Sequence, residues 1–205
     1  MSIPISWRPL VIIWYRYGSE LGPVQGVGYI NELLARLTDH PVEDHTQTNQ
    51  TLDSNSETFP LGRGIYVDFS HDNLMTAVAS AMGLFRDKNF ISGRVLDPTR
   101  RDDSRDWFIS RIVPFSGRMV VERIDCGSPS SGQGISRRTI FPWAERRVKN
   151  EDRAVFVRVL MNDAVQKLDF CEGVDEDGLC PLPSFVKSQS YAKENGQGDW
   201  ERCFL

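Results

Sequence analysis

Residues 65–85 read IYVDFSHDNLMTAVASAMGLF, and this stretch decides the fold class. Its first five residues are mostly β-branched or aromatic, which predicts a short strand over residues 65–69. Apolar side chains then recur at helical spacing, at Leu74, Val78, Ala81 and Phe85. Because the residues between them are also mostly apolar or small, the pattern predicts a buried helix. A strand that passes through a tight turn into a buried helix is typical of an α/β fold.

The turn between the two elements, Ser70-His71-Asp72-Asn73, is the strongest candidate site in the chain. Ligands of α/β proteins bind at the carboxyl edge of the sheet, where a helix start offers free N–H groups and a positive dipole end. A histidine there can contact a phosphate oxygen, and an aspartic acid beside it can protonate a leaving alkoxide. The alternative interpretation of the tetrapeptide alone is structural, with Ser70 or Asp72 as the N-cap of the helix.

Upstream of this stretch the sequence predicts an amphipathic helix and a loop. Apolar side chains recur every three or four residues at Val27, Ile30, Leu34 and Leu37, which indicates a helix that ends before the proline at position 41. Residues 41–60 are polar and rich in Thr, Asn, Ser and Asp, as in a surface loop.

Downstream the sequence predicts more strands and one further helix. Strands are expected over residues 118–124, 155–161 and 164–168, with Asn162-Asp163 as the hairpin turn between the last two. A last helix is expected over residues 184–193.

Composition places the chain among ordinary globular proteins. It has 205 residues, of which 40% are hydrophobic and 25% charged, enough for one large domain or two small ones. The formal net charge of −4 argues against a nucleic-acid partner held by phosphate contacts. The apolar run at residues 10–15 is only six residues long, far short of the roughly 20 that span a bilayer. We therefore expect neither a membrane partner nor a signal peptide in this chain.

Two segments fit the pattern poorly. Residues 1–13 form an atypical N-terminus with no clear period. Residues 127–152 begin with Ser, Gly and Pro and then become basic, with Phe141 and Trp143 isolated among polar residues. A mobile insertion is the favoured interpretation in an acidic chain, and an aromatic-interleaved nucleic-acid contact is the alternative.

Several separated blocks resemble the C-terminal half of fungal phytases and related histidine acid phosphatases. The blocks that carry the resemblance, in family order, are GPVQGVG at 22–28, NELLARLT at 31–38, NQTLDS at 49–54, YVDFSHDN at 66–73, VPF at 113–115, VVE at 120–122, VRVLMND at 157–163 and GDWERCF at 198–204. The resemblance thus covers residues 14–126 and 153–205, so that residues 14–205 are expected to be the C-terminal portion of a histidine acid phosphatase domain.

The resemblance implies a fold and a reaction. The fold is the C-terminal part of the phosphoglycerate-mutase-like histidine phosphatase fold, an α/β sandwich with a smaller helical domain, here with an incomplete sheet. The reaction is phosphomonoester hydrolysis at acid pH through a phosphohistidine intermediate, on a substrate such as phytate, in a secreted protein. In this comparison His71 contacts the phosphate and Asp72 is the proton donor.

The nucleophilic histidine of the family lies in an Arg-His-Gly-x-Arg-x-Pro motif, which this chain does not contain. Its three histidines are His40, His45 and His71, and none has Arg before it and Gly after it. Covalent catalysis therefore lacks its attacking group and much of its charge stabilisation. We expect the chain alone to be inactive, as a fragment that results from a truncated gene model or a partial gene, with residues 127–152 as a translated intron.

The resemblance also gives roles to the four cysteines. It implies a disulfide between Cys171 and Cys180 around a short acidic loop, whereas the partners of Cys126 and Cys203 would lie outside this chain. Two free thiols are therefore expected, unless these two cysteines pair with each other. The acidic loop lacks the ligand spacing of a calcium-binding loop. Asn49-Gln50-Thr51 is an N-glycosylation sequon, which matters only in a secretory compartment.

No metal or cofactor is expected. His40, Asp44 and His45 lie close together in the sequence, but no further ligands follow at the usual spacing, so a polar loop is the favoured interpretation. Gly26-x-Gly28 is only a weak match to a dinucleotide loop, because Asn31 replaces the third glycine.

Two functional hypotheses remain. The first is an enzyme fragment that supplies the His71 and Asp72 part of a phosphatase site. The second is a non-catalytic secreted binding or interaction module derived from the same fold. The first predicts exposed sheet edges and aggregation of the isolated chain, and the second predicts cooperative unfolding.

Overall fold

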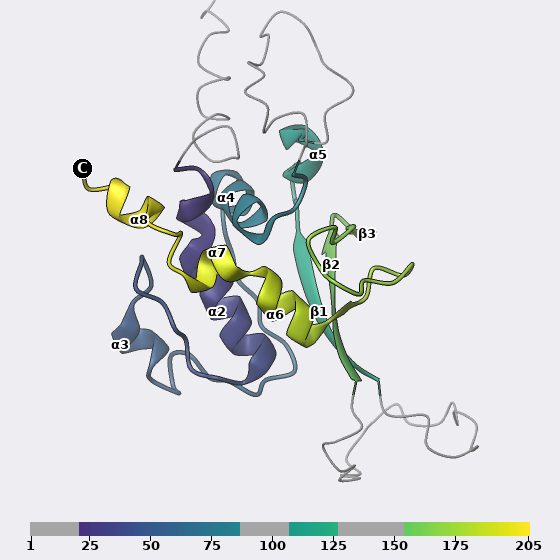
Figure 1. Ribbon diagram of the computed structural model, residues 1–205, viewed down its shortest axis with the longest axis horizontal. Coiled ribbons are helices and arrows are strands. Elements are labelled where there is room, and N and C mark those ends of the chain that lie inside the picture. The colour runs from purple at the N-terminus through teal and green to yellow at the C-terminus, as the bar shows by residue number, and fades with distance from the viewer. Residues whose placement is uncertain (1–20, 87–106, 127–153) are drawn as a thin grey trace, which may run out of the picture.

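The computed structural model describes residues 21–86, 107–126 and 154–205 (Figure 1). Two sequence predictions, the atypical N-terminus at 1–13 and the insertion at 127–152, lie outside these residues.

The predicted amphipathic helix is confirmed as α2, Val27–Thr38. A short 3-10 helix, η2 (Pro23–Gly26), leads into it, and the proline suits the start of a helix because its missing N–H needs no partner there. The four apolar residues that predicted the helix are all buried. The helix ends at Asp39, which adopts a left-handed conformation with φ 58°.

The predicted buried helix is also confirmed, as α4 (Asp72–Met82). All of its residues from 76 to 82 are buried, so the helix is surrounded by protein on every side over its last two turns. Gly83 ends it in a left-handed conformation with φ 96°, which glycine adopts at little cost.

The sheet is built around β2, Ala154–Met161. β1 (Met119–Cys126) pairs antiparallel with β2 along the full length of both strands, with Val121 opposite Val159. On the other edge of β2 lie two short strands, β3 (Ala164–Val165) and β4 (Cys180–Pro181). Val157, Val159 and Met161 are buried in β2, which confirms the alternation that predicted this strand.

The predicted hairpin turn joins β2 to β3. Asn162 and Asp163 have φ angles of 51° and 67°, as in the two-residue turns that match the twist of the flanking strands. The amide of Asn162 also donates hydrogen bonds to the carbonyls of Arg111 (2.8 Å) and Ile112 (3.0 Å). These bonds attach the short helix α5 (Ile109–Ile112) to the end of the sheet.

The prediction of a single C-terminal helix over residues 184–193 is wrong in detail. Two helices, α6 (Leu182–Ser188) and α7 (Ser190–Lys193), meet at Gln189. Gln189 is buried, and its amide donates a hydrogen bond to the carbonyl of Met82 at 3.2 Å. This contact joins Gln189 to the end of α4 at the position where α6 ends and α7 begins. A final short helix, α8 (Asp199–Arg202), follows.

The strand expected over residues 65–69 is not formed among the described residues. Ile65, Val67 and Phe69 are 81%, 68% and 96% exposed, and no described strand pairs with this segment. A strand forms only when a neighbouring strand pairs with its backbone. A β-prone sequence by itself favours an extended conformation but does not supply that neighbour. The segment instead runs unpaired from the loop at 41–60, which holds the short helix α3 (Gln50–Asp53), to the start of α4.

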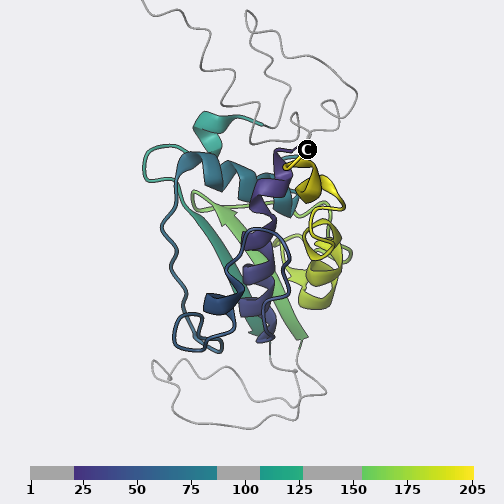
Figure 2. The ribbon, with the colours of Figure 1, turned by 90° about the vertical axis from the view of Figure 1, so that its left-hand side faces the viewer.

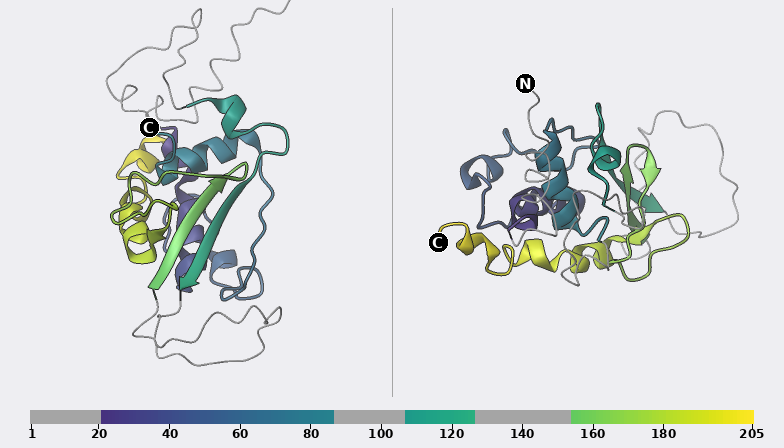
Figure 3. Two further views of the ribbon diagram at one scale, coloured as in Figure 1. Left: turned by 90° about the vertical axis from the view of Figure 1, so that its right-hand side faces the viewer. Right: turned by 90° about the horizontal axis from the view of Figure 1, so that it is seen from above.

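The helices α2 and α4 lie against one face of the sheet (Figures 2 and 3). The core lies between this face and the helices, and Ile30, Met82, Val159 and Phe185 are among its fully buried members. The expected α/β class is confirmed as a mixed arrangement, whose described strand pairs are antiparallel. Within the described residues no helix has the length and hydrophobicity to cross a bilayer.

Candidate active site

The two predicted site residues lie at the start of α4. His71 is the N-cap residue, with extended backbone angles of φ −119° and ψ 162°, and Asp72 is the first residue of the helix. Both side chains are exposed. Since the imidazole of His71 makes no capping hydrogen bond, and neither Ser70 nor Asp72 occupies the cap position, the site is not a simple side-chain N-cap.

The start of α4 favours an anion. The helix has 11 residues, so its aligned peptide dipoles place a partial positive charge at this end. Asp72 Oδ1 accepts a hydrogen bond from the backbone N–H of Asn73 at 2.8 Å, which orients the carboxyl group. An imidazole and a carboxyl group side by side at such a terminus can contact an anionic substrate and exchange a proton with it.

Arg36 of α2 fixes the segment that leads to the site. Its guanidinium donates a hydrogen bond to Asp68 Oδ2 at 2.5 Å and lies 4.9 Å from the ring centre of Phe59 and 5.1 Å from that of Tyr66. The hydroxyl of Tyr29 lies 3.3 Å from the same carboxylate oxygen. The contacts of Arg36 with Asp68, Phe59 and Tyr66 attach residues 59–68 to the last turn of α2.

Burial and the charges around Arg36 shift two pKa values. Burial, and then the negative charge of Asp68, raise the pKa of Tyr29 to about 12. Burial, and then the carboxylate of Asp53, raise the pKa of Glu32 to about 7, although Arg36 one helical turn away acts in the opposite direction. Glu32 therefore changes its charge between acid and neutral pH.

A groove of about 860 Å³ runs beside the segment that carries the site residues. One wall is formed by residues 62–68 and the other by residues 118–124, which include most of β1. Tyr29, Leu33 and Leu37 of α2 also line it. The segment before α4 and β1 run along the same side of the molecule (Figures 2 and 3).

The loop with His40, Asp44 and His45 is a structural feature. Asp44 is buried, and its carboxylate accepts hydrogen bonds from Asn31 (2.7 Å), Thr46 (2.9 Å) and Thr48 (2.9 Å). Burial acts to raise the pKa of Asp44, but these hydrogen bonds outweigh it and lower the pKa below its usual value. Among the described residues, no group of three or more His, Cys, Asp or Glu side chains is placed to hold a metal ion.

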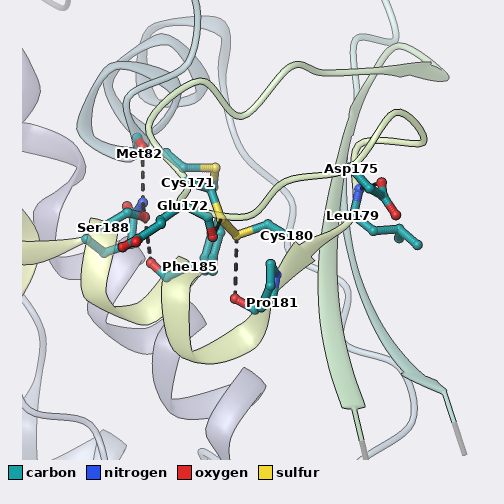
Figure 4. The surroundings of a disulfide bond; sticks show 10 residues. Met82, Cys171, Glu172, Asp175, Leu179, Cys180, Pro181, Phe185 and Ser188 are labelled. Atoms are coloured by element: carbon teal, nitrogen blue, oxygen red, sulfur yellow. Dashed lines mark hydrogen bonds between the residues drawn. A yellow bond between two sulfur atoms is a disulfide. The ribbon is translucent and has the colours of Figure 1, made fainter.

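The disulfide between Cys171 and Cys180 is present (Figure 4). Inside the loop that it closes, Asp175 Oδ1 accepts hydrogen bonds from the backbone N–H groups of Asp177 (3.0 Å) and Leu179 (2.8 Å). The carboxylate thus stabilises the loop itself. Cys126 and Cys203 are both free and exposed, as the resemblance implies.

The sequon lies in an exposed turn. Asn49 is the N-cap of α3, and its side-chain oxygen accepts hydrogen bonds from the N–H groups of Thr51 (3.1 Å) and Leu52 (3.3 Å). The side chain of Asn49 is exposed to solvent.

Sequence patterns did not reveal the contacts around Arg36. Arg36 lies on the polar side of a predicted helix, and Asp68 interrupts an apolar run. Only the fold brings these two residues together, since 32 positions separate them. The one available signal was the charge of Asp68 inside a β-prone segment.

Comparisons with known proteins agree with this description. The model of the histidine phosphatase superfamily (branch 2) matches residues 8–162. Phytase A of Aspergillus oryzae is 39% identical over 190 residues, which are 93% of this chain and 35% of that protein. Phytase A of Neurospora crassa is 37% identical over 205 residues, or 93% of this chain and 38% of that protein. Phytase A of Arthroderma benhamiae is 40% identical over 190 residues, or 91% of this chain and 35% of that protein.

The chain spans a little over a third of the length of these relatives, less than the half that the resemblance implied. The identity nevertheless extends over nine-tenths of the chain. The family model also covers the turn with His71 and Asp72. The chain therefore belongs to the histidine phosphatase superfamily, branch 2.

Proposed function

We propose that this chain supplies one part of a phosphomonoesterase site of the phytase or acid phosphatase type, with His71 as a phosphate contact and Asp72 as the proton donor. The observation that carries the proposal is the placement of both exposed side chains at the positive end of α4. The names of the relatives support phytate or a similar phosphate ester as the substrate.

The reaction needs a nucleophile that the printed chain lacks. A histidine from an Arg-His-Gly motif would attack phosphorus as the bond to the ester oxygen breaks. Asp72 would give its proton to that oxygen, and water would then hydrolyse the phosphohistidine. His71 would bind a non-bridging phosphate oxygen, with the dipole of α4 stabilising the developing negative charge.

The first test is the activity of the chain alone. We expect no release of phosphate from p-nitrophenyl phosphate or phytate at acid pH, because none of the three histidines lies in the nucleophile motif. Measurable turnover that persists after repurification would contradict the argument from the missing nucleophile.

The second test places the chain in a complete enzyme. In a chimera, this chain replaces the corresponding 190 residues of Aspergillus oryzae Phytase A. We expect Asp72→Asn to lower kcat by about 100-fold or more, as loss of a general acid does, and His71→Ala to raise KM. Asp177→Asn, an exposed carboxylate in the disulfide loop, is the matched control and should leave both constants unchanged.

An active chimera with an unaffected Asp72→Asn variant would remove Asp72 from the mechanism. A folded but inactive chimera would instead favour the second candidate function, a non-catalytic binding module. Two features support a binding module as the alternative. They are the exposed, unpaired segment before α4 and the groove beside it.

We also propose that the protein is secreted and carries a glycan on Asn49. The exposed sequon and the disulfide support this. The glycan is tested by expression of the chain behind a fungal secretion leader, because no signal peptide is expected in the chain itself, followed by peptide N-glycosidase treatment and mass spectrometry. Thr51→Ala removes the sequon but keeps the N-cap side chain of Asn49, so it should abolish the mass shift. Ser54→Ala leaves the sequon intact and should keep the mass shift. An unmodified wild-type protein in the medium would refute the glycan.

A further inference from the structure

Two carboxylates lie beside the guanidinium of Arg36. One of its terminal nitrogens bonds to Asp68 Oδ2 at 2.5 Å, whereas the other lies 3.8 Å from Glu32 Oε2, one helical turn earlier on α2. Arg36 Nε is buried and has no hydrogen-bond partner among the described residues. The guanidinium therefore holds Asp68 closely and Glu32 only loosely, although it has donors for both.

The surroundings of Glu32 contain more negative than positive charge. Besides the guanidinium of Arg36, three further carboxylates act on this residue, and they belong to Asp53 in α3, Asp44 in the loop at 41–60, and Asp68. Asp53 Oδ2 is buried without a hydrogen-bond partner in the described part of the chain. The side chains of Glu32 and Arg36 are only 25% and 14% exposed, so solvent screens these charges weakly. A negative charge on Glu32 is therefore costly as long as the other carboxylates stay in place.

The elements around Glu32 differ in how firmly they are held. Most residues of α2 are buried, so the helix that carries Glu32 and Arg36 is fixed in the core. In contrast, α3 has no buried residue, and none of residues 59–70 is buried. Repulsion from a charged Glu32 is therefore relieved by movement of these peripheral segments rather than of α2.

We propose that Glu32 makes the attachment of residues 59–68 to α2 dependent on pH. When Glu32 is protonated, Arg36 is left to Asp68, and the segment stays on the helix. When Glu32 releases its proton to solvent, its carboxylate competes for Arg36 and repels Asp68 and Asp53, so the segment detaches.

The coupling acts in both directions. If a charged Glu32 weakens the bond between Arg36 and Asp68, then loss of that bond must make Glu32 easier to ionise by the same free energy. The pKa of about 7 for Glu32 in the attached state places the change between acid and neutral pH. The inference goes beyond the proposed reaction, since Glu32 touches no substrate in it.

The first experiment follows the two aromatic rings on Arg36 by NMR of the isotope-labelled full chain between pH 5 and 8.5. We expect the ring signals of Phe59 and Tyr66 to titrate with the same midpoint as the side-chain carboxyl carbon of Glu32. In Glu32→Gln, which keeps the shape of the side chain without its charge, both rings should keep their pH 5 positions throughout. Glu57→Gln is the matched control, because Glu57 is an exposed carboxylate of the same loop, and it should titrate as the wild type does.

The second experiment measures the reverse effect. Asp68→Asn removes a like charge and frees Arg36 for Glu32, so the midpoint of the Glu32 titration should fall by about one pH unit or more. Asp177→Asn, an exposed carboxylate in the disulfide loop, should leave the midpoint unchanged. Circular dichroism at pH 5 checks that each variant is folded as the wild type is.

Three results would overturn the inference. The first is a Glu32 that titrates while the rings of Phe59 and Tyr66 do not respond. The second is a ring titration that persists in Glu32→Gln, because another group would then be its source. The third is an unchanged Glu32 midpoint in folded Asp68→Asn. No substrate enters these measurements, so a failed phosphatase assay leaves them intact and the two proposals fail separately.

Discussion

Arg36 is the residue on which the approach to the candidate site depends most. Its side chain is only 14% exposed and pairs with Asp68, which lies three positions before His71. Two aromatic rings, those of Phe59 and Tyr66, pack on the guanidinium. A lysine offers neither the planar group that stacks on rings nor the same hydrogen-bond geometry. Arg36 is therefore a positioning residue, which acts on the site through residues 59–68.

Glu32, one turn before Arg36, makes stability depend on pH. Its folded-state pKa of about 7 lies above the value of about 4.3 in an unfolded chain. Between these values the folded protein holds a proton that the unfolded chain releases. The contribution of Glu32 to stability is therefore largest below about pH 4.3 and falls as the pH rises to 7. Besides Asp53 and Arg36, the carboxylates of Asp68 and Asp44 act on this group.

Glu32→Gln removes this titration. We expect the variant to equal the wild type at pH 4 and to exceed its free energy of unfolding at pH 7.5 by about 1–3 kcal/mol. Urea denaturation at a series of pH values measures the difference. Glu43→Gln, at an exposed position, is the control and should keep the wild-type slope. A Glu32→Gln protein that is less stable than the wild type at pH 7.5 would contradict the pKa assignment.

At the scale of elements, η2 and α4 are held together by a close approach of their backbones. A Cβ atom at Gly26 would lie 2.5 Å from the carbonyl oxygen of Ala77 and 2.8 Å from Cα of Val78. Backbone atoms on α4 cannot yield as a flexible side chain would. Glycine is thus required here by space.

Gly26→Ala should therefore reduce the free energy of unfolding by about 1–3 kcal/mol, the usual cost of overpacking a core. Gly64→Ala is the control, because a Cβ atom at Gly64 meets nothing within 4 Å, and it should be neutral or slightly stabilising. Urea denaturation followed by circular dichroism compares the two variants. Equal midpoints would mean that α4 shifts freely away from η2, contrary to the packing described.

The elements also show what the sequence could predict. Apolar spacing located α2, and alternation located β2, because each pattern reports burial within a single element. The turn at Asn162-Asp163 was predictable from residues that tolerate positive φ. The strand expected over residues 65–69 is not formed, because pairing depends on a neighbouring strand and local sequence does not report such a neighbour. The break at Gln189 depends on a contact with Met82, which is 107 positions away.

The same distinction applies to the candidate site. His71 and Asp72 are neighbours in the chain, so a motif could locate them, and the helix that follows could be predicted from its apolar residues. The position of their segment depends on Arg36 and Asp68, whose contact is tertiary. Local sequence thus predicts which groups are present at the site but not what holds them in place.

At the scale of the whole molecule, backbone hydrogen bonds and buried side chains are distributed unevenly around the sheet. β2 is covered on one edge by β1 and on the other by β3 and β4, and three of its side chains are in the core. The main chain of residues 64–70 makes no hydrogen bond to another described residue, and the apolar side chains of this segment, Ile65, Val67 and Phe69, are exposed. The part of the molecule that delivers the candidate catalytic residues is thus attached mainly through side chains to α2.

Hydrogen exchange tests this distribution. We expect the amides of β2 and the interior of α4 to exchange slowly, since their hydrogen bonds break only on extensive unfolding, whereas the amides of residues 64–70 should exchange at nearly the rate of an unfolded peptide. Mass spectrometry of the native full chain, with fragmentation to single-residue resolution, measures both sets at once. Arg36→Lys should leave the exchange of β2 unchanged, because Arg36 contacts residues 59–68 rather than the sheet centre. Protection of residues 64–70 equal to that of β2 would mean that this segment already has a strand partner in the isolated chain.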